Sequence, residues 1–270
     1  MNPSRIFTDV FAIPLMILAV SAAAAASDPP SAGQIMEKNF FASKLRVLKS
    51  DSTMLLINDS GQTRERKSIT LTKLQKNGID SKLLVRFLSP ADIKGTSFLQ
   101  VEHAEGDDDQ WIYLPALKKS RRLVASNKKD SFVGSDFSYG DILLSKVDFY
   151  RHTLLRTETI DGKECYVVES APRDEDVKRN SGYSKKITWV RKDNFLETKV
   201  EYYDVPGRLL KTQSISGHQL VDPDTQRWFA LRREMINHQT GHKTILVFER
   251  IEAGVPAADD LFTTRNLERE

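Results

Sequence analysis

The chain has 270 residues, and its 40 basic residues nearly balance its 37 acidic ones, which leaves a net charge of +3. This balance gives no reason to expect nucleic acid as a partner, because proteins that bind it usually carry a clear basic excess. Cys165 is the only cysteine, so no disulfide can form within the chain and the fold must rest on its hydrophobic core.

The N-terminus has the pattern of a cleavable secretory signal peptide. Arg5 supplies a positive charge, an apolar run covers residues 10–20, and Ala24-x-Ala26 matches the site that signal peptidase accepts. A membrane span needs roughly 20 predominantly apolar residues, and this run is shorter. We therefore expect cleavage near Ala26, export to the periplasm and one mature domain over residues 27–270. With no cysteine near the cleavage region to carry a lipid anchor, we expect the mature protein to diffuse freely.

The first predicted element after the signal peptide is a helix over residues 31–42, since Ser31 and Gln34 have the spacing of a capping box. Short extended runs separated by turn residues follow. They cover residues 46–57, 68–75, 83–88, 98–103, 111–114, 149–160, 164–170, 185–190, 196–203, 209–215, 228–237 and 244–251. Because most connections are short, neighbouring strands should be antiparallel; parallel strands need long crossovers.

Alternation along the strands predicts a sheet with one apolar face. Ile187 and Trp189 share one side of their strand, and Lys186 and Thr188 share the other. An apolar face must close on itself, pair with a second sheet or be covered by helices. The leading helix and the irregular stretch 126–144 are the candidates for that cover.

The sequence contains no pattern typical of a catalytic or metal site. It has no Gly-x-Ser-x-Gly elbow, and Cys165 lies in a strand-like run where a buried, inert thiol is expected. His238 and His242 lie close together, but no cysteine or carboxylate stands beside them at metal-ligand spacing. We expect no catalytic residue, metal or cofactor. A hydrolase acting on lipid or cell-wall material is a further alternative, which requires clustered buried carboxylates or a Ser–His pair.

Two further features of the sequence are candidates for a functional role, and the first is a basic cluster. It comprises Lys118, Lys119, Arg121, Arg122, Lys128 and Lys129. One interpretation is a solvated strand and loop, the usual fate of a charge run. The other is a docking patch for anionic headgroups or an acidic partner.

An aromatic stretch is the second feature. It comprises Phe132, Phe137, Tyr139, Phe149 and Tyr150, set among small residues. These rings either pack in the core or form a mobile apolar lid over a cavity.

Three motif segments carry a family resemblance: FLSPADIKGTSFL at 87–99, WIYLPALKKSRR at 111–122 and FVGSDFSYGD at 132–141. In this order they resemble a divergent branch of the outer-membrane lipoprotein-sorting protein family, the LolA-like periplasmic carriers. This branch is often found alongside exporters of the resistance-nodulation-division (RND) type. The resemblance extends over most of the mature chain, from the first helix to Phe262.

The resemblance implies a mainly β fold: an incomplete antiparallel β-barrel, that is, a strongly curved sheet capped by helices over a hydrophobic cavity. It also implies a non-enzymatic periplasmic carrier that shields the acyl chains of a lipoprotein or lipid during transfer between membranes. The expected cavity or lid residues are Trp111, Tyr113, Phe137, Tyr139, Trp189 and Tyr202. Arg121 and Arg122 are expected to face headgroups or a membrane partner.

The expected partners follow from this interpretation. They are lipoprotein or lipid cargo and, transiently, a membrane surface, with the carrier itself a monomer. The alternative is a non-catalytic periplasmic accessory protein of an RND-type exporter, which uses the same sheet to contact an inner-membrane transporter.

Overall fold

One antiparallel sheet of 13 strands organises the computed structural model, which describes residues 29–143 and 146–269. The predicted signal peptide lies outside the described residues. The strands are β1 (Val47–Ile57), β2 (Thr63–Leu74), β3 (Ser81–Ser89), β4 (Ser97–Val101), β5 (Asp109–Leu114), β6 (Lys119–Leu123), β7 (Tyr150–Ile160), β8 (Lys163–Pro172), β9 (Tyr183–Arg191), β10 (Glu197–Asp204), β11 (Leu209–Asp222), β12 (Arg227–Asn237) and β13 (Lys243–Ala253). The α-helices are α1 (Ala32–Ala42), α2 (Tyr139–Ile142), α3 (Glu175–Ser181) and α4 (Thr264–Leu267).

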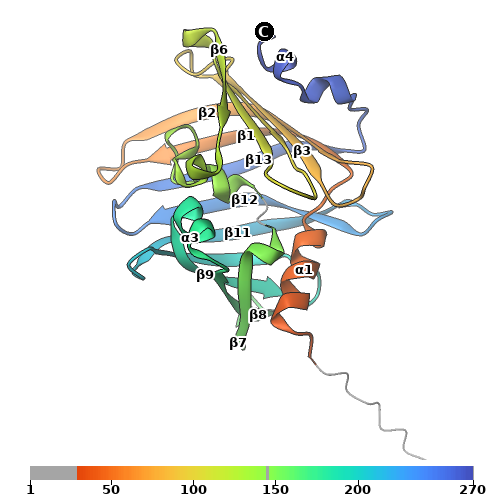
Figure 1. Cartoon of the computed structure of the whole chain (residues 1–270), viewed down its shortest axis with the longest axis vertical. Helices are drawn as coiled ribbons and strands as arrows, with labels where there is room; N and C mark the ends of the chain where they lie inside the picture. The colour runs from red at the N-terminus through yellow and green to blue at the C-terminus, as the bar shows by residue number, and fades with distance from the viewer. Residues whose placement is uncertain (1–28, 144–145, 270) are drawn as a thin grey trace, which may run out of the picture.

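The sheet consists of two meanders joined along β1 and β13. Its strand order is β6-β5-β4-β3-β2-β1-β13-β12-β11-β10-β9-β8-β7, and every neighbouring pair is antiparallel. The sheet curves strongly but does not close, because β6 and β7 remain its two edges (Figure 1). The predicted fold class, an incomplete antiparallel barrel capped by helices, is confirmed.

Helix α1 covers the β7–β8 end of the concave face (Figure 1). The predicted capping box is present: the Ser31 and Gln34 side chains each accept a hydrogen bond from the other's backbone N–H. Ile35 is fully buried against Val168 and Val190, and this contact fixes the helix on the sheet. Within the described ranges, no helix is long and apolar enough to cross a bilayer.

The opposite, convex face carries separate apolar clusters. On β9, Ile187 and Trp189 pack there with Cys165 and Val167, while Thr188 faces the concave side. The apolar side of this strand is therefore the outer one, the reverse of what its alternation predicted. Both faces of the sheet bury apolar side chains, so alternation alone does not identify the concave one.

Candidate binding cavity

The chain passes from β6 to β7 across the concave face, and we call residues 124–143 the crossing segment. It contains two 3-10 turns, η2 (Ala125–Lys129) and η3 (Phe132–Gly134), followed by α2. Phe132, Phe137 and Tyr139 lie almost fully buried in the main core of the sheet. Three of the five rings in the predicted aromatic stretch therefore form the packed cover of the concave face, whereas Phe149 and Tyr150 lie outside the crossing segment, in η4 (Val147–Phe149) and at the start of β7.

The three motif segments meet at one end of this cover. The ring of Phe132 lies 5.6 Å from that of Phe98 and 5.4 Å from that of Tyr139, edge to face in both cases. Gly95, at a φ of 82°, lets Pro115 approach to 3.1 Å of where a Cβ would stand. A side chain at Gly95 would be strained both by this contact and by the left-handed backbone. The three motifs therefore pack together where the crossing segment contacts the sheet.

A buried ion pair holds the segment to the second meander. Asp141 accepts hydrogen bonds from Lys211 Nζ at 2.7 Å, from the Tyr183 hydroxyl at 2.9 Å and from the backbone N–H of Ser138 at 2.8 Å. Burial alone would raise the pKa of Asp141. The charges of Lys211 and Lys186, together with these donated hydrogen bonds, outweigh burial and bring the pKa below its ordinary value.

Further polar contacts reach both halves of the sheet. The Thr244 hydroxyl of β13 donates to Asp136 at 2.7 Å, and Lys211 donates to the Asp136 carbonyl oxygen at 3.0 Å. From β2, Arg66 donates to the carbonyl oxygen of Val133. The crossing segment is therefore fixed by a few side-chain contacts rather than by a strand ladder.

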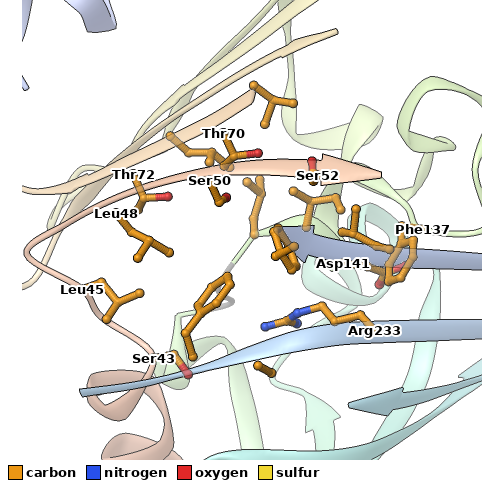
Figure 2. A pocket seen from close by; sticks show the side chains of 18 of the residues that line it. Ser43, Leu45, Leu48, Ser50, Ser52, Thr70, Thr72, Phe137, Asp141 and Arg233 are labelled. Carbon is orange, nitrogen blue, oxygen red and sulfur yellow. The ribbon is translucent and has the colours of Figure 1, made fainter. Parts of the chain in front are cut away.

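Between this segment and the sheet lies a cavity of about 180 Å³. Figure 2 shows Phe137 and Asp141 at one end of it, and Ser43 with Leu45 at the other. Its apolar lining includes Leu48, Met54, Leu83, Val85, Phe87, Phe132, Phe137, Ile142, Leu143, Ile215, Ala230, Leu246 and Phe248. This apolar surface can bury part of a hydrocarbon chain.

Hydroxyl groups of β1 and β2 form one wall of the cavity, the hydroxyl wall, with Leu48 and Met54 beside them on β1. They belong to Ser50, Ser52, Ser68, Thr70 and Thr72. Ser52 and Ser68 share a hydrogen bond of 2.7 Å across the two strands. Facing this wall, Arg233 extends into the cavity (Figure 2) and pairs with Glu197 at 3.4 Å. The cavity is thus amphipathic, more polar than the uniformly apolar sheet face that the sequence predicted.

A second buried ion pair lies at the end of the cavity near α1. Lys44 and Glu102 pair with side-chain exposures of 2% and 8%, and Ser81 donates its backbone N–H to the same carboxylate at 2.6 Å. Burial raises the pKa of Glu102 against the opposing effect of Lys44. This pair ties the residues after α1 to β3 and β4.

Three of the residues predicted for cavity or lid lie on the concave side. Phe137 lines the cavity. Tyr139 packs beside it in the crossing segment. Tyr202 is buried in the same core, where its hydroxyl donates to Gln213 at 2.7 Å.

The other three lie on the convex face and do not line the cavity. Trp111 and Tyr113 pack with Phe262 beneath the C-terminal segment. Trp189 is buried by its strand neighbours and by Lys199, whose Nζ lies 4.2 Å from the ring centre. The inward residue between the two β5 aromatics is Ile112.

Arg121 and Arg122 lie on the exposed edge strand β6. Arg122 donates to Asp109 at 2.6 Å, and Arg121 stands opposite Ile112 in the strand register. The hairpin before them exposes Leu117, at 68% the most exposed large apolar residue described. This edge therefore presents an exposed apolar tip among cations.

Comparisons with known proteins agree with this geometry. A family model described as "Uncharacterized protein" matches residues 79–269, whereas no curated protein matches the chain. A domain described as an outer membrane lipoprotein-sorting protein, from Vibrio parahaemolyticus, is 32% identical with a TM-score of 0.80; the match covers 88% of this chain and 98% of that one.

Two further solved structures are similar. A DUF1329 family protein from Desulfovibrio piger is 30% identical with a TM-score of 0.80, over 87% of this chain and 97% of that one. A LolA superfamily protein from Nitrosomonas europaea, at 23% identity, has the same fold with a TM-score of 0.65, over 88% of this chain and all of that one. The predicted family is confirmed: the chain belongs to the outer-membrane lipoprotein-sorting protein family and has the LolA-like fold.

Proposed function

We propose that this protein is a periplasmic carrier that shields an acyl chain of a lipid or lipoprotein during transfer between membranes. The observation that carries the proposal is the amphipathic cavity enclosed between the sheet and the crossing segment. Each buried methylene is worth about 0.8 kcal/mol, so a chain does not leave a membrane at a useful rate unless a cavity recovers much of that energy. Binding of this kind needs no covalent chemistry.

The size of the cavity limits what it holds in this conformation. Pockets for drug-sized ligands measure roughly 300–1,000 Å³, and about 180 Å³ is smaller than that. One chain, or part of one, can enter, while a multi-chain cargo requires the crossing segment to move outward. Because that segment has only the single bridge Ser131–Ser138 as β-structure, moving it breaks side-chain contacts and leaves the sheet intact.

The carrier proposal is tested by binding. The protein is purified from the periplasm, extracted with solvent and analysed by mass spectrometry, and the delipidated protein is titrated with a fluorescent fatty acid. Ala230→Trp fills the cavity from β12, while Ile236→Trp adds the same ring at an exposed position of that strand. We expect copurified lipid, and binding that Ala230→Trp abolishes and Ile236→Trp preserves. No copurified lipid and no titratable binding would exclude the carrier.

We further propose that the β6 edge docks transiently on an anionic membrane. Arg121, Arg122 and their neighbours would each contribute about 1 kcal/mol near such a surface, while Leu117 enters the headgroup layer. Co-sedimentation with phosphatidylglycerol vesicles should decrease strongly in the Arg121→Ala/Arg122→Ala variant. If this variant bound the vesicles as well as the wild-type protein, Arg121 and Arg122 would be excluded as membrane-binding residues.

An accessory role at an RND-type exporter is the second candidate function. The observation that favours it is the exposed edge β6, whose unpaired backbone groups can pair with a strand of another protein. Crosslinking followed by affinity purification separates the two roles. An inner-membrane transporter recovered without lipid supports the accessory, whereas lipid recovered without a transporter supports the carrier.

A further inference from the structure

A second, polar chamber of about 130 Å³ adjoins the cavity. Asp141, Ile142, Leu143, Glu197 and Arg233 line both spaces and form the partition between them. α1 and the crossing segment cover the chamber, and the strands from β7 to β12 form its floor.

A row of polar side chains crosses this floor where a core sheet would ordinarily carry apolar ones. The register places His152, Ser170, Lys186, Tyr202 and Lys211 side by side on β7 to β11. His152 Nε2 donates to the Val147 carbonyl oxygen at 3.1 Å, so its Nδ1 accepts from the Ser170 hydroxyl at 2.8 Å. The row is therefore ordered by its own hydrogen bonds at the end nearest β7.

Three of the cations around the chamber form ion pairs. Lys211 pairs with Asp141, Arg233 pairs with Glu197, and Lys146 pairs with Asp108 at 3.5 Å. In residues 29–143 and 146–269, Lys186 forms no ion pair, although it lies close enough to Asp141 to lower its pKa.

Tyrosine rings surround the Lys186 ammonium group. The centroids of Tyr150, Tyr183 and Tyr202 lie 5.3, 5.4 and 5.5 Å from its Nζ. Aromatic faces attract a cation at such distances without neutralising it. Burial holds the pKa of Tyr183 and of Tyr202 well above the ordinary value and lowers that of His152, so these neighbours are neutral near pH 7.

An unpaired donor accompanies this cation. Gln213 is 1% exposed, and its carbonyl oxygen accepts from Tyr202, but its Nε2 has no partner in the described part of the chain. Gln213 lies in the row adjacent to the one that contains Lys186. In the strand register, Val200 pairs with Gln213, and Tyr202, two residues further along β10, pairs with Lys186. A buried donor without a partner costs free energy, and an acceptor on a ligand would recover it.

We infer that the polar chamber binds the anionic headgroup, phosphate or carboxylate, of a single-chain amphiphile whose alkyl chain lies in the adjoining cavity. Lys186 supplies the charge and Gln213 Nε2 a hydrogen bond. The inference rests on the proposed carrier function and adds the chemical class of its cargo. The headgroup joins the alkyl chain at the partition between the two spaces, beside Leu143 and the Arg233–Glu197 pair.

Three ligands of equal chain length test this: dodecyl phosphate, dodecyl maltoside and dodecyltrimethylammonium, each titrated calorimetrically below its micelle-forming concentration. Dodecyl phosphate should bind at least about tenfold more tightly than the others, the ratio expected for one charge-assisted hydrogen bond. Lys186→Gln and Gln213→Leu should remove that preference and leave maltoside binding intact. Lys185→Gln is the matched control, because the Lys185 side chain lies on the opposite face of β9, where it pairs with Glu169 of β8.

The outcomes separate this inference from the carrier proposal. Equal binding of the three ligands to wild-type protein overturns the headgroup site but not the carrier proposal. The same conclusion follows if the Lys186→Gln variant still binds dodecyl phosphate more tightly than the other two ligands. Binding of none of them overturns both. Inorganic phosphate, titrated alone, should bind weakly; if it matched dodecyl phosphate, the site would bind free anions and the link to the alkyl chain would be wrong.

Discussion

Asp141 and Lys211 form the contact that matters most for the position of the crossing segment, with side-chain exposures of 0% and 7%. Asp141→Asn leaves the ammonium group buried without its counter-charge, and breaking a buried pair in this way costs about 3–5 kcal/mol. We expect a clear fall in the midpoint of thermal unfolding by calorimetry. Asp176→Asn is the control, because its pair with Arg179 is exposed and worth at most about 1 kcal/mol. Equal effects of the two variants would contradict this role.

The same carboxylate predicts how stability depends on pH. Its pKa is lower in the folded protein than in the unfolded chain, where it is about 3.9. The stabilisation is therefore present above that unfolded value and is lost as the pH falls through the folded one. The free energy of unfolding in urea should decrease between pH 5 and pH 3 more steeply in wild-type protein than in Asp141→Asn. Parallel profiles would show that Asp141 does not contribute.

The sequence predicts the chemistry of side chains better than the face of the sheet on which they lie. Phe137 reaches the cavity, but Trp111 does not, because Ile112 occupies the inner side of β5 and distant Phe262 covers the outer side. Nothing near Trp111 in the sequence signals that cover. Serines and threonines at alternate positions of β1 and β2 were the available signal for the hydroxyl wall. The position of Arg233 depends on tertiary packing.

The crossing segment should be displaced from the cavity more readily than the strands of the sheet. Arg66 holds it through the Val133 carbonyl oxygen, so Arg66→Ala should increase amide hydrogen exchange over residues 131–138 while β1 and β13 stay protected. Arg64→Ala, two residues earlier on the same strand and exposed, serves as the control. Unchanged exchange in Arg66→Ala would mean that the contact between Arg66 and Val133 does not hold this part of the segment in place.

Elements with strong local signals are the predictable ones. α1 begins at its predicted capping box, and turn residues mark most strand ends. β6 is absent from the predicted extended runs and appears only as the solvated strand that one interpretation of the basic cluster allowed, because only Leu123 of its five residues is buried and no alternation results. The fold of the crossing segment depends on Lys211 and Thr244, which lie far along the sequence, so only its aromatic character is predictable.

At the scale of the whole molecule, the pairing of β1 with β13 makes one curved sheet out of two meanders. Local patterns predict antiparallel neighbours along each meander, but they contain no information about this contact between the ends of the chain. The family resemblance implied an incomplete barrel, but it did not specify that the first and last strands pair. The concave face that results brings the amphipathic cavity next to the polar chamber, and the proposed function depends on this arrangement.

The most direct test of that arrangement is photo-crosslinking with a fatty acid that carries a diazirine along its chain, followed by peptide mapping. We expect crosslinks at residues that line the cavity, such as Phe137, Ile142 and Leu246, and unlabelled fatty acid should suppress them. Crosslinks confined to the convex face, around Trp111 or Trp189, would contradict an acyl chain bound beneath the crossing segment.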